Sequence, residues 1–411
     1  MTSYRQVLGV PGMAPLLGVS LLARTAITAD VTALTLYVVL SLKLGYVAAG
    51  AVAAALTAGV ALGGPLLGRL IDSRGLRAVL LVTLLAQVAF WLSVPLLRYE
   101  LLLAASVVAG LLMVPVQAVS RQAIAAMTTA ELRRTAFALE SVQGELSYLV
   151  GPAVVILGAA TVSPELVAWG VGAAILAGSS GIALLNPPMR TPDDGNATTG
   201  RLSRRQWLNA DMIAALTMAL GTTTLLSGVD LAIIATLREA GQVSWAAVVV
   251  VVFGLSSVVG GLVYGALARP LPTWLLLGTL GLVTIPAGLA DTWPWLCVAV
   301  VGSGLLTAPT LATVADAVSR LAPPGVRGEA TGLQSSAQSA GFALGSPLVG
   351  VAIDLWVPAG GFAAAGIAGL AAALVGRLLT GHSPTREVGE VCRPAQQPGN
   401  PSSVGGGPAR Q

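Results

Sequence analysis

Residues 63–77 read GGPLLGRLIDSRGLR, and apolar runs long enough to cross a lipid bilayer stand on both sides of them. The stretch contains four charged residues, three arginines and Asp72, which are costly in hydrocarbon and therefore belong in water. Gly64 and Gly68 lack side chains, so the backbones of the flanking helices can approach each other closely. The stretch therefore predicts a short charged hairpin between two transmembrane helices.

The composition of the whole chain favours a membrane protein. Of its 411 residues, 55% are apolar and only 10% are charged, and the mean hydropathy is +0.83; soluble domains carry about 25% charged residues. His382 is the single histidine, and Cys297 and Cys392 lack the spacing of metal ligands. We therefore expect no metal site, no cofactor, no enzymatic activity and no nucleic-acid partner.

Twelve segments meet the requirement of about 20 largely apolar residues for a transmembrane helix. They are residues 14–40, 46–71, 76–97, 100–121, 134–159, 165–187, 211–237, 243–268, 273–291, 294–319, 329–353 and 358–380. Most arginines fall in the connections on one side, while Lys43, Arg98 and Arg238 fall on the other. The positive-inside rule then predicts a multi-pass protein of the inner (cytoplasmic) membrane with both termini in the cytoplasm.

The chain divides into two halves that repeat each other. Residues 188–210 form a polar linker between six-helix bundles at 1–187 and 211–380, and residues 381–411 read as a disordered cytoplasmic tail. At one constant offset, Gly63, Gly64, Gly68 and Leu70 match Gly260, Gly261, Gly265 and Leu267; at another, Gly110, Pro115, Arg133 and Gly151 match Gly304, Pro309, Arg327 and Gly345. The second copy lacks the charged hairpin, because Arg269-Pro-Leu-Pro stands in its place.

The charged hairpin resembles the signature loop between helices 2 and 3 of the major facilitator superfamily. The matching residues are Gly68, Leu70, Asp72, Gly75 and Arg77, whereas Ser73 and Leu76 stand where the family often has basic residues. The resemblance covers about residues 10–380. It implies an all-α fold of two six-helix bundles around a central cavity, which rock to expose that cavity to each side of the membrane in turn.

A second, weaker resemblance lies on helix 5. Gly144, Gly151 and Pro152 resemble the glycine–proline motif of drug–proton antiporters, although Ser147 replaces one of its glycines. This favours the drug and metabolite efflux branch of the family, of actinobacterial type. Close packing between helices explains the same glycines equally well, and this alternative stays open.

Five charged residues lie inside the predicted spans and away from their ends. They are Arg24 and Asp30 on helix 1, Glu140 and Glu145 on helix 5, and Asp230 on helix 7. A charge in hydrocarbon costs about 2.5–3.5 kcal/mol on insertion scales, so we expect each of these residues to have a functional or structural role. Our hypothesis is that Glu145, with Glu140 or Asp30, binds the coupling proton: burial favours the neutral carboxyl group, and a contact with Arg24 or Arg121 favours the charged one. The alternative is a permanent ion pair between Glu145 and Arg24.

The candidate substrate and proton pathway comprises Arg24, Asp30, Gln117, Glu140, Gln143, Glu145, Asp230, Gln334 and Gln338. The candidate gating residues are Gly68, Asp72, Arg74, Gly75, Arg77 and Arg121. Arg121 closes the predicted helix 4, which suits an anchor in the cytoplasm, but the family resemblance implies a contact with Asp72 instead. Near the positive N-terminal end of helix 11, Asp72 would latch the cytoplasmic side shut in the outward-open state.

These features predict a monomeric secondary transporter in the lipid bilayer, with a small-molecule substrate and a proton as coupling ion. Buried carboxylates and an otherwise apolar chain favour proton-coupled efflux of an amphipathic compound, such as a drug or secondary metabolite. Antibiotic resistance would be the corresponding phenotype. An importer or facilitator of a small nutrient is the alternative. A non-transporting membrane sensor is a more distant one, because no soluble output domain is attached.

Overall fold

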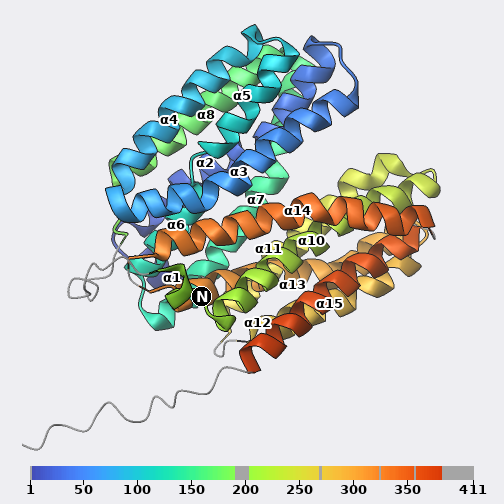
Figure 1. Ribbon diagram of the computed structural model, residues 1–411. Helices are drawn as coiled ribbons and strands as arrows, with labels where there is room; N and C mark the ends of the chain where they lie inside the picture. Colours follow the sequence, from blue (N-terminus) through green and yellow to red (C-terminus); the bar gives the residue numbers. More distant parts are fainter. Residues whose placement is uncertain (1, 190–202, 268–270, 324, 356–357, 382–411) are drawn as a thin grey trace, which may run out of the picture.

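The computed structural model describes residues 2–189, 203–267, 271–323, 325–355 and 358–381. These residues form two helical bundles, which meet along α3, α7, α11 and α14 (Figure 1). The N-terminal bundle contains α1 (Thr2–Leu8), α2 (Met13–Leu36), α3 (Tyr46–Arg74), α4 (Leu76–Ser93), α5 (Tyr99–Leu111), α6 (Val116–Met127), α7 (Ala130–Thr161) and α8 (Pro164–Leu185). After the short α9 (Arg204–Trp207), the C-terminal bundle contains α10 (Ala210–Glu239), α11 (Ala246–Ala266), α12 (Thr273–Thr284), α13 (Trp293–Leu321), α14 (Arg327–Leu355) and α15 (Pro358–Gly381).

The prediction of twelve transmembrane helices is confirmed. Among the described residues, 11 helical spans are long and apolar enough to cross a membrane, and the shorter apolar span Thr273–Leu289 corresponds to the ninth predicted segment. The expected linker at 188–210 lies between α8 and α10, and its residues 190–202 fall outside the described ranges. The expected tail after Gly381 lies outside them as well.

The fourth predicted helix is broken in the middle. α5 ends at Leu111 and α6 begins at Val116, because Pro115 has no N–H to donate and also disfavours helical geometry at the residue before it. The break leaves backbone carbonyls without helical partners. The side-chain amide of Gln87 on α4 donates to two of them, Ala109 O at 2.8 Å and Leu112 O at 3.3 Å. α6 then continues to Met127, beyond the predicted end of the segment.

Each bundle has its own hydrophobic core. One large cluster draws only on residues from Ala23 to Ile182, with Trp91 and Ile175 fully buried in it, and another draws only on residues from Ala214 to Ala373. Because the two cores share no residue, the bundles can change their mutual orientation without exposing either core.

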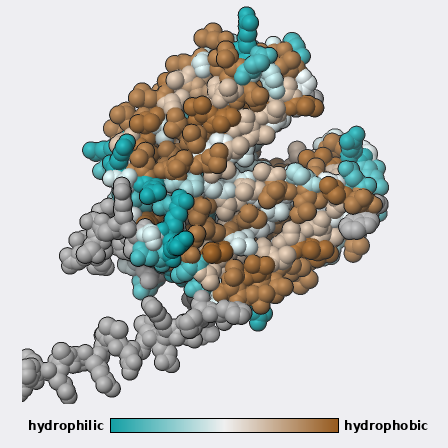
Figure 2. Space-filling model, viewed as in Figure 1, coloured by the Kyte–Doolittle hydropathy of each residue, from teal (hydrophilic) through white to brown (hydrophobic). Residues whose placement is uncertain are grey.

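The two bundles meet most closely at one end of the molecule, the end that carries α1, which we call the closed end. Ala312 and Ala315 on α13 share a small apolar cluster there with Val7 on α1 and Phe137 on α7. At the opposite end, the surface is hollowed between the two bundles (Figure 2). Broad apolar surfaces cover the outer sides of both bundles, as expected for helices that face lipid (Figure 2).

Candidate transport cavity and its closed end

A cavity of about 270 Å³ lies between the bundles. Its walls come from α2, α3, α6 and α7 of one half and from α10, α11, α13 and α14 of the other. Among its lining residues are the predicted site residues Arg24, Gln117, Arg121, Glu145, Asp230 and Gln338. The helices of both halves therefore bring most of the predicted intramembrane charges to one place.

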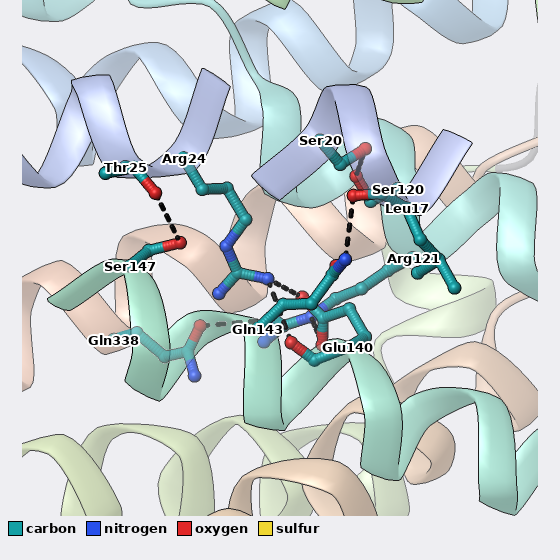
Figure 3. A network of polar contacts seen from close by, with 10 residues as sticks. All are labelled: Leu17, Ser20, Arg24, Thr25, Ser120, Arg121, Glu140, Gln143, Ser147 and Gln338. Carbon is teal, nitrogen blue, oxygen red and sulfur yellow. Dashed lines mark hydrogen bonds and ion pairs between the residues drawn. The ribbon is translucent and has the colours of Figure 1, made fainter. Parts of the chain in front are cut away.

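Two arginines share one buried carboxylate on the side of the cavity toward α2 and α6 (Figure 3). Glu140 is fully buried and forms an ion pair with Arg24 through one carboxylate oxygen and with Arg121 through the other, the latter at 3.4 Å. Arg121 also donates to the side-chain oxygen of Gln338 on α14 at 3.2 Å. With all three groups ionised, this triad carries one net positive charge.

The structure corrects the prediction for Arg121. The residue lies inside α6, not at a helix end, and it is only 2% exposed, so it does not anchor the chain in water. It also points to Glu140, whereas its neighbour Gln122 faces Asp72, with 3.5 Å between the amide nitrogen and the carboxylate. Adjacent residues on a helix point about 100° apart. On α6 it is therefore the side chain of Gln122, and not that of Arg121, that reaches the charged hairpin.

The carboxylates of Glu145 on α7 and Asp230 on α10 both face the cavity, from opposite halves. The Tyr148 hydroxyl donates to Asp230 at 3.3 Å, and its ring stacks on Phe342 with 6.3 Å between centroids. Ser257 on α11 is a hydrogen-bond partner of Glu145. Within the described ranges, neither carboxylate has an ion-pair partner. The alternative of a permanent Glu145–Arg24 pair is therefore wrong for this conformation, because Arg24 pairs with Glu140.

Four predicted pathway residues do not line this cavity: Glu140, which is fully buried and paired with the two arginines, and Asp30, Gln143 and Gln334. Asp30 is 5% exposed, and its carboxylate accepts from the N–H of Val31 at 2.5 Å. The Gln143 amide donates to the carbonyl of Leu17 on α2 at 2.7 Å (Figure 3). Gln334 is fully buried, and its amide has no hydrogen-bond partner among the described residues. Sequence reasoning did not single out Phe253, Ser257 and Phe342, since apolar and small residues in an apolar helix carry no distinguishing signal.

At the closed end, Asp72 caps the N-terminus of α14. Its two carboxylate oxygens accept hydrogen bonds from the backbone N–H groups of Gly328 and Glu329, each at 2.9 Å. The first N–H groups of a helix have no partner within it, and the helix dipole favours a negative charge there. The expected approach of Asp72 to this helix end is therefore present, with Gln122 as the side chain beside it.

Glycines let α3 and α14 approach to backbone distance. A Cβ atom on Gly68 would overlap the carbonyl of Gly328, and one on Gly64 would press on the carbonyl of Gly332. Gly75 separates α3 from α4 with a φ of 84°, which L side chains rarely adopt. Arg74 and Arg77, beside it, are exposed. Of the predicted gating residues, Gly68 and Asp72 thus form the contact between the bundles, while these two arginines face outward.

In the second copy of the repeat, the contact between the bundles is made at the C-terminal end of α11, and the backbone there accepts hydrogen bonds where the N-terminus of α14 donates them. The C-terminal turn of α11 lacks an acidic hairpin, and side chains of the N-terminal half donate to its carbonyl groups instead. Thr135 on α7 donates to Gly265 O at 2.8 Å, Arg134 donates to Leu267 O, and Tyr4 on α1 donates to Leu262 O at 2.5 Å. Donors and cations suit a helix C-terminus as a carboxylate suits an N-terminus.

Comparison with known proteins agrees with this architecture. Residues 211–402 match the family model described as Major Facilitator Superfamily. Superposition on solved structures extends the likeness in fold to about 90% of the chain. The chain has the fold of the major facilitator superfamily. No curated protein matches the sequence.

Three solved structures illustrate the likeness. The human organic anion transporter MFSD10 (TETRAN) is 17% identical, with 90% of this chain and 99% of that chain covered and a TM-score of 0.71. A bacterial homologue of the iron transporter ferroportin, in an outward-facing state, is 15% identical over 89% and 97%, with a TM-score of 0.69. The proton:xylose symporter XylE, bound to 6-bromo-6-deoxy-D-glucose, is 13% identical over 90% and 95%, also with a TM-score of 0.69. The family match and this major facilitator fold indicate a transporter and not an enzyme.

Proposed function

We propose that this protein is a secondary active transporter that exports a small amphipathic compound in exchange for protons by alternating access. The observation that carries the proposal is the cavity between the bundles. It holds two carboxylates, Glu145 and Asp230, that have no ion-pair partner among the described residues. The two arginines that line it are paired with Glu140, and most of the exposed lining surface is apolar. An unpaired carboxylate on a membrane-spanning helix is a suitable carrier for a coupling proton.

The contacts at the closed end support alternating access. They consist of hydrogen bonds from side chains to helix ends and of glycine contacts between backbones, and they leave the core of each bundle intact. Breaking them would open the cavity toward the closed end, while the hollow at the other end would close. With both termini in the cytoplasm, as the distribution of arginines favours, the closed end is cytoplasmic and this conformation is outward-open.

Everted membrane vesicles test the proposal. An imposed gradient, acidic inside, should drive accumulation of an exported amphipathic dye in vesicles that contain the protein, and Glu145→Gln should abolish this accumulation while the protein stays folded. Glu100→Gln is a matched control, because Glu100 is exposed at the start of α5. If E145Q vesicles accumulate dye as well as those with the unaltered protein, Glu145 does not carry the coupling proton.

Import of a small nutrient remains the second candidate function, since the proton:xylose symporter XylE shares this fold. The same vesicles distinguish the two directions. Accumulation in everted vesicles that is driven by an acidic interior supports export. Accumulation in right-side-out vesicles that is driven by an acidic exterior supports import.

A further inference from the structure

The charged groups that line the cavity do not balance, even when Glu140, which is fully buried and pairs with both lining arginines, is counted with them. Arg24 and Arg121 contribute two positive charges, and Glu140, Glu145 and Asp230 contribute three negative charges, so the fully ionised set carries one net negative charge. Among the described residues that line the cavity, Tyr148 is the one other titratable group, and it is neutral as a hydrogen-bond donor to Asp230. The walls from α11, α13 and α14 contribute only uncharged lining residues, such as Thr307 and Gln338.

The two arginines are not free to take an anion. Both are committed to Glu140, their side chains are 13% and 3% exposed, and Arg121 is also bound to Gln338. Glu145 and Asp230, in contrast, face the cavity without an ion-pair partner. A desolvated charge needs compensation, so the available position in the cavity favours a positive ligand.

The surfaces beside the carboxylates suit an organic cation more than a hydrated metal ion. The stacked rings of Tyr148 and Phe342 lie next to Asp230, and Phe253 adds a third ring to the lining. Aromatic faces attract organic cations, and apolar walls bury their hydrocarbon parts. Ser141 also lines the cavity, is 3% exposed, and has a buried hydroxyl without a hydrogen-bond partner in the described structure.

We infer that the substrate is an organic cation with a single positive charge, held between Glu145 and Asp230, and that it exchanges for one proton without net movement of charge. One bound monocation brings the cavity to neutrality, and so does one proton on either carboxylate. Both together would leave an uncompensated positive charge in a desolvated site. The two therefore exclude each other. This inference rests on the proposed function, since it names the substrate class and the stoichiometry of that same cavity.

Binding to purified protein in detergent tests the charge preference without any gradient. Tetraphenylphosphonium and tetraphenylborate are probes of nearly the same size and opposite charge. We expect the phosphonium to bind, and Glu145→Gln and Asp230→Asn each to weaken its binding by roughly tenfold or more, the loss typical of one charged interaction. Glu100→Gln should leave the binding unchanged. Binding of the borate as tightly as the phosphonium, no phosphonium binding, or phosphonium binding that neither substitution weakens would each overturn the inference.

Proteoliposomes test the exchange ratio. A pH gradient should drive phosphonium transport, and a potassium diffusion potential set with valinomycin at equal pH should add no protein-dependent transport. Protein-dependent transport driven by the potential alone would overturn the neutral one-for-one exchange. Phosphonium binding that depends on both carboxylates, without transport driven by a pH gradient, would refute the proposed function but leave the cation site standing. Proton-driven transport of a neutral compound, without phosphonium binding, would refute the cation site alone.

Discussion

The carboxylate of Asp72 on α3 accepts hydrogen bonds from the backbone N–H groups at the start of α14, with 2.9 Å to Gly328 N. This joins the end of a helix in one bundle to the beginning of a helix in the other. The backbone N–H of Glu329, the next residue, donates to the other carboxylate oxygen of Asp72 at 2.9 Å, and the Glu329 side chain forms an ion pair with Arg204 on α9 at 2.6 Å. The linker helix and the charged hairpin therefore meet at the same helix end.

Removing the Asp72 carboxylate should favour opening of the closed end. A helix N-cap contributes about 0.5–2 kcal/mol, so Asp72→Ala should shift the balance between the two conformations by roughly two- to thirtyfold. Electron–electron distances between spin labels at Arg69 and Arg205, both exposed, report this change after Cys297 and Cys392 are replaced by serine. Ser73→Ala, at the exposed neighbouring residue, is the control. An unchanged distance distribution in D72A would show that the contact does not hold the bundles together.

A side chain at Gly68 should prevent the closed end from forming. A Cβ atom there overlaps the backbone carbonyl of Gly328, which cannot move aside without separating α3 from α14. We expect Gly68→Ala to fold, because each bundle keeps its own core, but to lose substrate transport. Gly50→Ala is the control, since a Cβ atom at Gly50 meets open space. Normal transport by G68A would contradict the need for this close packing.

The donors at the end of α11 should contribute less than Asp72. Thr135→Val keeps the shape of the side chain and removes its hydrogen bond to Gly265 O. The expected shift toward opening corresponds to about 0.5–1.5 kcal/mol, the net value of a neutral hydrogen bond. The same spin-label distances measure it. Thr161→Val is the matched control, because that hydroxyl is exposed and bonds only within its own helix. A T135V effect larger than that of D72A would reverse the assigned ranking.

Glu140 should matter for stability more than Glu145 does. Its substitution by glutamine leaves Arg24 and Arg121 buried without a counter-charge, a loss of about 3–5 kcal/mol for a broken buried ion pair. Glu145 has no ion-pair partner in the described structure, so Glu145→Gln should leave the thermal unfolding temperature near that of the unaltered protein. Thermal unfolding in the same detergent compares the two variants. Equal unfolding temperatures for E140Q and E145Q would show that the triad does not stabilise the bundle.

The helices were predictable from the sequence, because a bilayer imposes both their length and their apolar character. The approach of Asp72 to α14 followed from the family resemblance. The break before α6 and the orientation of Arg121 could not be predicted in this way, since both depend on how Pro115 interrupts one helix. The pairing of Arg24 with Glu140 also escaped sequence reasoning: 116 positions separate the two residues, and nothing local indicates which carboxylate an arginine will reach.

One proton and one substrate cation should compete for the carboxylates of the cavity. The most direct measurement counts the protons released when tetraphenylphosphonium binds to the purified protein in a weakly buffered solution. As the pH falls and the unliganded carboxylates take up a proton, we expect the release to rise toward about one proton per bound cation, and we expect no such release from the E145Q/D230N variant. Binding of the cation without release of a proton, at every pH, would contradict this competition.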